Sequence, residues 1–221
     1  MVGDIMKEEK TKKEKEMEED HKRLEPEDKT VRELLTEMKD NSELIADLAY
    51  AALVYDNRDL AEEVGHLESR MDNMMYQIRL KSMLSARNLD DAEQLSGLLQ
   101  IASSAEKISD AAEDMVELLD LDIDLKSMLP HILEKADEHI HTIRVLENSD
   151  LVGKKIGDLA IESVTGVRII ALRRKGRWIY GPDGKNYIYA NDRLIVGGVE
   201  EGYKKLRKVA KSKENWKGME S

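Results

Sequence analysis

The chain has 221 residues and a formal net charge of −11, from 35 Lys and Arg against 46 Asp and Glu. Charged residues make up 37% of the sequence, well above the roughly one quarter usual in globular proteins, which favours helices with solvated faces. The absence of cysteine excludes disulfides, iron–sulfur clusters and thiolate zinc sites. The longest mostly apolar run, Ile45–Tyr55, is far shorter than the roughly 20 residues of a membrane span, and the charged N-terminus predicts no signal peptide.

Charge divides the chain into three segments. Residues 1–28 carry 7 basic and 11 acidic side chains, residues 29–150 carry 12 and 27, and residues 151–221 carry 16 and 8. A basic segment after an acidic one indicates separate domains with different partners. The first segment has few large apolar residues, so burial cannot offset the entropy lost on ordering. We therefore predict a disordered or frayed helical tail over residues 1–27.

Three amphipathic helices are predicted within residues 28–120. Apolar residues recur at helical spacing over Val31–Ala52, Leu60–Ile78 and Leu95–Leu119. Each helix is expected to open with a capping box, formed by Thr30 with Glu33, Asp59 with Glu62, and Asp90 with Glu93. Long helices joined by short turns are typical of an antiparallel bundle. Three methionines on the second stripe are interpreted as core packing: Met71, Met74 and Met75.

A small mixed domain is predicted after the bundle. Residues 121–137 are expected to form a connecting helix, residues 138–211 a domain of order β-α-β-β-β-α, and residues 212–221 a frayed tail. Strand-like runs are found at 139–146, 167–172 and 193–196, with shorter ones at 178–180 and 187–189, and helices are expected at 154–161 and 200–210. The fold class predicted for the whole chain is therefore α+β, a three-helix antiparallel bundle followed by this domain.

The first and third predicted helices each carry a Glu-x-x-x-Asp motif, Glu43 with Asp47 and Glu106 with Asp110. The second motif lies in the segment Ala-Glu-Lys-Ile-Ser-Asp that begins at Ala105. These motifs on a three-helix unit resemble the PhoU domain, over about residues 28–120. The resemblance supports a metal site at the four acids.

The geometry of these helices points the same way. Within each motif the two acids lie one turn apart, on the face opposite Ile45 or Ile108, which we assign to the apolar stripe. The first and third helices of an up-down-up bundle run parallel, so both pairs could lie at similar height. Four carboxylates there would suit a divalent or ferric cation. The alternative is a solvated acidic face, because 27 acids in residues 29–150 make the motif frequent by chance.

Several blocks in the last third of the chain follow one another in a recognisable order. They are Ser149–Leu159, Gly166–Ala171, Arg173 with Arg174, Pro182–Gly184 and Asp192–Gly198. This order resembles the TrkA-C domain, the C-terminal half of RCK regulators of potassium transport. RCK regulators normally also carry a Rossmann half with a glycine-rich nucleotide loop. This chain has no G-x-G-x-x-G sequence, so we expect no NAD.

Arg168, Arg173 and Arg174 are the candidate ligand-binding residues of this domain. Guanidinium groups suit an anionic small ligand such as a nucleotide or cyclic dinucleotide. The basic cluster could instead be a solvated turn, or could dock onto the acidic bundle of a second subunit. We expect no nucleic-acid partner, because the chain is acidic and, without Phe, offers little surface for stacking bases.

The resemblances together imply a regulatory protein. The sequence contains no nucleophile elbow, P-loop or H-E-x-x-H motif, so we predict that it is not an enzyme. We expect a regulatory subunit of a cation channel or transporter, with potassium as the ion, that senses a ligand through a TrkA-C homodimer. An apolar strand at Leu194–Val196, expected to be exposed on a small core, also favours a two-fold dimer.

Localisation follows from this prediction: we expect a cytoplasmic protein, held at the inner face of the membrane by its partner. The alternative function is a metal- or phosphate-responsive PhoU-type signalling adaptor that acts through the bundle.

Overall fold

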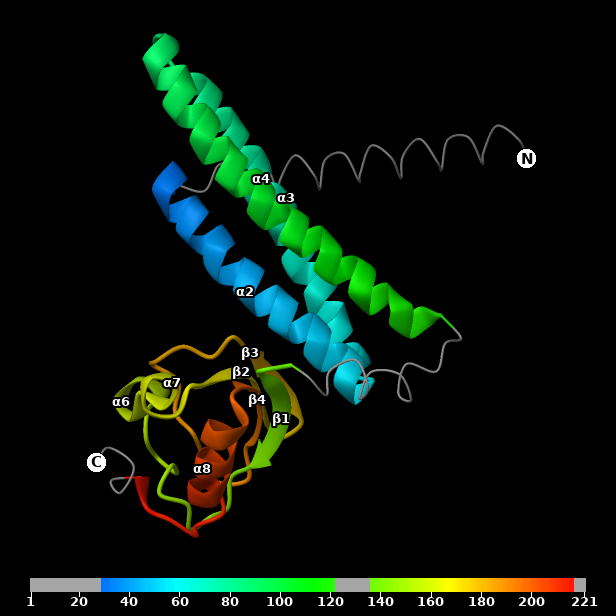
Figure 1. Cartoon of the computed structure of the whole chain (residues 1–221), viewed down its shortest axis with the longest axis vertical. Helices are drawn as coiled ribbons and strands as arrows, with labels where there is room; N and C mark the ends of the chain where they lie inside the picture. Colours follow the sequence, from blue (N-terminus) through cyan, green and yellow to red (C-terminus); the bar gives the residue numbers. More distant parts are fainter. Residues whose placement is uncertain (1–28, 122–135, 217–221) are drawn as a thin grey trace, which may run out of the picture. The chain divides into compact units, whose positions relative to one another are not determined.

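The computed structural model describes residues 29–121 and 136–216 (Figure 1). Within these ranges the chain divides into two compact units, one of residues 29–42 and 66–110, the other of residues 43–65, 111–121 and 136–216. The predicted tail at 1–27, nearly all of the predicted connecting helix, and the last five residues of the predicted frayed end lie outside the described residues.

Three long helices form an N-terminal bundle, as predicted: α2 (Val31–Tyr55), α3 (Arg58–Ser85) and α4 (Leu89–Glu117). A 3₁₀ turn, η1 (Leu118–Asp120), follows them. The capping box predicted for the first helix is confirmed. The backbone N–H of Thr30 donates to Glu33 Oε2 at 2.7 Å, and the N–H of Glu33 donates to Thr30 Oγ1 at 3.3 Å.

The other two helices begin two residues earlier than the sequence predicted. Asn57 Oδ1 accepts the backbone N–H of Asp59 at 3.0 Å, and Asn88 Oδ1 accepts that of Asp91 at 2.9 Å. The two asparagines therefore serve as the N-caps, in place of Asp59 and Asp90. Asparagine caps a helix as well as aspartate does. The positions of the acids alone therefore did not identify the first residue of α3 or α4.

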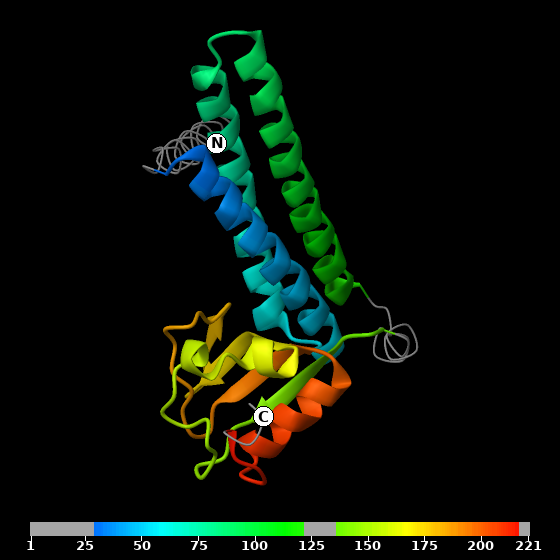
Figure 2. The same ribbon diagram turned by 60° about the vertical axis from the view of Figure 1, so that its left-hand side comes forward.

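An apolar cluster of the first unit forms where α3 and α4, joined by the turn at 86–88, lie side by side (Figure 2). Its buried members are Leu34, Met38, Met71, Met74, Met75, Ile78, Ala102 and Ala105. The three methionines of α3 are at most 4% exposed, which confirms that they pack in the core. Methionine side chains are unbranched and flexible, so they fill irregular gaps between packed helices.

The apolar stripe of α4 differs from the predicted one at Ile108. That side chain is 46% exposed, whereas its neighbour Ser109 is 1% exposed. The buried face of α4 consists mainly of small residues, Ala102, Ala105, Ser109 and Ala112. Because small side chains allow helices to approach closely, α4 buries this face and leaves Ile108 exposed.

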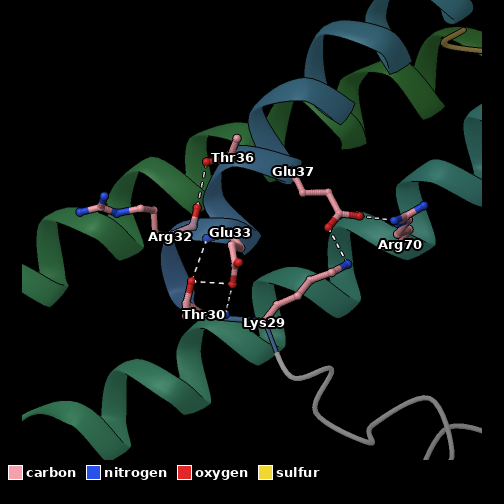
Figure 3. A network of polar contacts seen from close by, with 7 residues as sticks. All are labelled: Lys29, Thr30, Arg32, Glu33, Thr36, Glu37 and Arg70. Carbon is pink, nitrogen blue, oxygen red and sulfur yellow. Dashed lines mark hydrogen bonds and ion pairs between the residues drawn. The ribbon is translucent and has the colours of Figure 1, made fainter. Parts of the chain in front are cut away.

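A polar network joins α2 to α3 in the first unit. Glu37 lies between Lys29 and Arg70 (Figure 3), with Lys29 Nζ donating to Glu37 Oε2 at 2.7 Å and Arg70 paired with Oε1. Burial acts to raise the pKa of Glu37, but the hydrogen bond from Lys29 and the charge of Arg70 outweigh it and lower that pKa below its ordinary value.

The second unit contains a four-stranded antiparallel sheet of order β1-β4-β2-β3. The strands are β1 (His139–Arg144), β2 (Val167–Arg174), β3 (Arg177–Tyr180) and β4 (Arg193–Gly198). The helices are α6 (Ile156–Leu159), α7 (Ile161–Thr165) and α8 (Glu200–Ala210) (Figure 2), and apolar side chains of these helices and of the sheet form one buried cluster. The α+β class and the order β-α-β-β-β-α are confirmed, except that the first helix is broken at Ala160, whose φ is 44°.

Two predictions about strands were wrong. Residues 187–189 form no strand and make one isolated bridge, between Lys155 and Tyr187, because this segment turns back to bond Asp192. Leu194, Ile195 and Val196 are at most 2% exposed, not exposed on a small core. Leu194 and Val196 pack in the apolar cluster with side chains of α8, and β4 lies between β1 and β2 inside the sheet.

Gly202 in the first turn of α8 allows that helix to approach α7. A Cβ atom there would lie 1.9 Å from the carbonyl oxygen of Thr165. We predict that Gly202→Ala lowers the free energy of unfolding by about 1–3 kcal/mol, because backbone must move to admit the methyl group. Chemical denaturation of the full chain measures this loss.

Gly97→Ala in α4 is the matched control. A Cβ at Gly97 has nothing within 4 Å, so the substitution should stabilise the helix by about 0.5–1 kcal/mol. A Gly202→Ala protein as stable as the wild type would contradict the close packing of α7 and α8.

Candidate functional site

The acid Asp47 of the first predicted metal motif is engaged by an arginine. Arg168 of β2 donates from Nε to Asp47 Oδ2 and from Nη2 to Oδ1, both at 2.6 Å. Arg168 Nη1 also donates to Glu138 Oε2 at 2.9 Å. The hydrogen bonds that Arg168 donates to Asp47, opposed by burial, raise the pKa of Arg168 above its ordinary value. Glu43, the other acid of this motif, is exposed.

The acids of the second motif face different groups. Asp110 lies with Glu68 and Asp72 of α3, where one carboxylate oxygen from each lies within 4.8 Å of the others. Glu106 instead faces Arg79, with 3.9 Å between Oε2 and Nη2. Three convergent carboxylates can hold a hard cation, although exposed acids also gather without one.

Glu68 and Asp72 repeat the Glu-x-x-x-Asp spacing on the second helix, and the sequence analysis did not select them. Their Glu-x-x-x-Asp spacing is the signal in the sequence that could have identified these two acids.

Arg174 is held by a buried carboxylate. Asp192 is 1% exposed and accepts from Arg174 Nε at 2.9 Å and Nη2 at 2.7 Å, and from the backbone N–H of Tyr189 at 2.8 Å. Arg174 Nη2 also donates to the carbonyl oxygen of Tyr187 at 2.6 Å, and the guanidinium lies 4.4 Å from the ring centre of Tyr189. These contacts hold the 187–192 segment against β2, so Arg174 has a structural role.

Arg173, the third candidate, has no carboxylate partner in the part of the chain that the structure describes. Its guanidinium lies 5.4 Å from the ring centre of Trp178, the residue opposite it on β3, and its Nε donates weakly to the carbonyl oxygen of Gly176 at 3.4 Å. Of the three arginines selected from the sequence, Arg173 is therefore the one whose charge is left without an ion pair.

Two further arginines stand beside Arg173 in the sheet. The register pairs Arg144 of β1 with Arg193 of β4, and Arg193 with Arg173 of β2. The preceding row, Ile143, Leu194 and Leu172, is buried in the apolar cluster with α8. Since side chains alternate along a strand, the three arginines project from the opposite face. We call them the arginine row.

The arginine row borders a hollow of about 270 Å³. Its lining residues are Arg144, Arg173, Lys175, Gly176, Asn191 and Arg193. Lys175 and Gly176 form the two-residue turn between β2 and β3, with φ values of 49° and 85°. Positive φ at both positions is the geometry of a hairpin turn that matches strand twist. The turn places a fourth cation beside the row.

The sequence analysis did not select Arg144 or Arg193. It placed both near the ends of predicted strands, but a single sequence does not show which strands pair or in what register. The hollow is lined by four cations and contains no acid, thiol or hydroxyl. Its chemistry is therefore that of anion binding.

Comparisons with known proteins agree with this architecture. The model of the PhoU domain matches residues 35–119, and that of the TrkA-C domain matches residues 140–211. Residues 35–119 thus match a PhoU domain and residues 140–211 a TrkA-C domain, in the order that the sequence motifs indicated. A search of curated proteins found no match.

Similar solved structures include two domains of regulators. The RCK_C domain dimer of S. agalactiae BusR in complex with c-di-AMP is 28% identical, covering 34% of this chain and 94% of that one, with a TM-score of 0.32. The RCK C domain of the potassium transport protein KtrA in complex with c-di-AMP is 26% identical, covering 37% and 94%, with a TM-score of 0.31. S. agalactiae BusR in complex with promoter DNA is 19% identical, covering 64% and 81%, with a TM-score of 0.32.

We predict that Arg174→Gln destabilises the protein and that Arg173→Gln does not. Loss of Arg174 leaves the buried Asp192 carboxylate without its partner, which should cost about 3–5 kcal/mol. Arg173→Gln removes only an aromatic contact at a partly exposed site, worth about 1 kcal/mol or less. Equal losses in denaturant titrations of the two variants would contradict this division of roles.

Proposed function

We propose that the chain is a non-enzymatic regulatory subunit of a cation channel or transporter, with potassium as the ion. The observation that carries the proposal is the TrkA-C domain at residues 140–211, next to a PhoU domain in one chain. The basic hollow of its sheet supports a ligand-sensing role, because unpaired arginines suit an anion such as a nucleotide or cyclic dinucleotide.

In this proposal the TrkA-C domains of two copies pair, and an anionic ligand changes the geometry of the dimer. A ligand has this effect only when it binds the two geometries with different affinity. The helical bundle then passes the change to a membrane partner. No helix in the described ranges is long and apolar enough to cross a membrane. The proposed location is the cytoplasm, at the inner face of the membrane, where the partner holds the chain.

Neither NAD nor nucleic acid is part of this proposal. The sequence has no glycine-rich nucleotide loop, and the net charge of −11 would repel a phosphate backbone outside the basic domain.

A second function is favoured by the cluster of Glu68, Asp72 and Asp110. With these three acids as ligands, the bundle would bind a divalent or ferric cation. The protein would then be a metal- or phosphate-responsive signalling adaptor, and the TrkA-C domain would serve to dimerise it.

One experiment separates the two functions. The full chain, tagged at its C-terminus, is used to recover partners from membranes of the native host, and its melting temperature is followed with ATP, cyclic di-AMP and Mn²⁺. The first function predicts a cation channel or transporter in the recovered material and a rise in melting temperature with a nucleotide. At a ligand concentration 100 times Kd the stabilisation would be about 2.7 kcal/mol.

Recovery of a phosphate transporter or a histidine kinase, with a melting shift for Mn²⁺ alone, would contradict the first function and support the second. The metal arm includes a variant with Glu68→Gln, Asp72→Asn and Asp110→Asn, and a control with Glu93→Gln, an exposed acid of the same helix as Asp110. A specific site loses the Mn²⁺ shift in the triple variant only, whereas general screening of acids leaves it in both.

A further inference from the structure

The arginine row does not stabilise the sheet. Like charges directly opposite each other on neighbouring strands repel, and here one row holds three of them, Arg144, Arg193 and Arg173. Lys175 adds a fourth positive charge to the same hollow. The free domain is therefore less stable than it would be with a neutral residue at the centre of this row.

The chain does not neutralise these charges with its own carboxylates. Across residues 29–121 and 136–216, none of the four cations of the hollow forms an ion pair. Arg144 donates to the neutral Asn191 Oδ1 at 2.9 Å, and Arg173 rests on Trp178. The side chain of Arg193, at the centre of the row, has no hydrogen-bond or ion-pair partner within those ranges.

Nearby acids are occupied by other donors. Asp192 is held by Arg174, the Asn191 amide donates to Glu147 Oε1 at 3.4 Å, and the indole N–H of Trp178 donates to Asp59 Oδ2 at 3.1 Å. The neighbouring arginines Arg168 and Arg174 are both paired with carboxylates, whereas the three arginines of the row are not paired within the described ranges.

The size of the hollow limits what could supply the missing charge. About 270 Å³ lies at or below the lower end of small-molecule pockets, roughly 300–1,000 Å³. It holds one or two phosphate groups and little more. Guanidinium groups match phosphate oxygens in pairs of parallel hydrogen bonds, and each phosphate monoester carries about −1.5 to −2 charge at neutral pH. A compact anion of at least two charges would balance the cations.

We infer that the hollow at Arg144, Arg193, Arg173 and Lys175 is a binding site for a phosphate or diphosphate group. The group is either a free inorganic anion or the phosphate end of a nucleotide whose remainder lies in solvent. Arg193 contributes most, because its charge is central in the row and makes no other contact. The inference deepens the proposed function, since it names the residues and the chemical class of the sensed ligand.

Isothermal titration of the full chain with inorganic pyrophosphate, at fixed ionic strength in KCl, tests this site. Wild type should bind with a dissociation constant in the millimolar range or tighter. Arg193→Gln and Arg144→Gln should each weaken binding at least tenfold. Without pyrophosphate the Arg193→Gln protein should melt at the same temperature as wild type or higher, because the substitution relieves repulsion.

Lys205→Gln is the matched control, since Lys205 is an exposed cation of α8 outside the hollow. Its affinity for pyrophosphate should stay within twofold of wild type. The inference is overturned when wild type does not bind pyrophosphate, or when Arg193→Gln weakens binding less than tenfold. It is also overturned when Arg193→Gln changes the oligomeric mass without affecting pyrophosphate, which would assign the row to a protein contact.

Two further titrations, with ATP and with cyclic di-AMP, identify the source of the phosphate and separate this site from the proposed function. ATP binding more tightly than pyrophosphate through Arg193 identifies a nucleotide, and the reverse identifies an inorganic anion. If wild type and Arg193→Gln bind cyclic di-AMP equally and neither binds pyrophosphate, the phosphate site is contradicted. The proposed ligand-sensing function is then still supported. Pyrophosphate binding that depends on Arg193, in a protein that recovers no membrane partner, would support the phosphate site. It would contradict the proposed function.

Discussion

The antiparallel register of β1, β4 and β2 is the constraint on which the C-terminal domain depends. It places Ile143, Leu194 and Leu172 in one row against α8, and the adjacent row of three arginines on the opposite face. A slip of one residue would exchange these faces and bury unpaired guanidinium groups. The cost of such burial fixes the register, and the register in turn brings three positive charges together.

The arginines of this domain have separate roles because of where their carboxylates lie. Asp192 is almost fully buried and holds Arg174, which secures the 187–192 segment to the sheet. Asp47 holds Arg168 with two hydrogen bonds. These pairs contribute to the fold, whereas the arginine row makes no pair and is available to an external anion.

Local patterns in the sequence determined most of the fold. Helical periodicity located α2, α3 and α4, and the order of strands followed from apolar runs between Gly, Pro and Asn turns. Asn57 and Asn88 cap α3 and α4 in place of the predicted Asp59 and Asp90, because Asn and Asp cap a helix about equally well. The burial of Ser109 instead of Ile108, and the alignment of Arg144 with Arg193, depend on contacts between segments distant in sequence. Periodicity within one segment contains no information on either.

The central claim is that the arginine row is a site of unrelieved repulsion in the free protein, and a double-mutant cycle of Arg144→Gln and Arg193→Gln measures it most directly. The two residues are directly opposite in the register, so the cycle should give an unfavourable coupling of roughly 0.2–1 kcal/mol in 20 mM salt. The coupling should shrink toward zero in about 1 M salt, where charges are screened beyond about 3 Å. A coupling of zero or a favourable one at low salt would contradict the account.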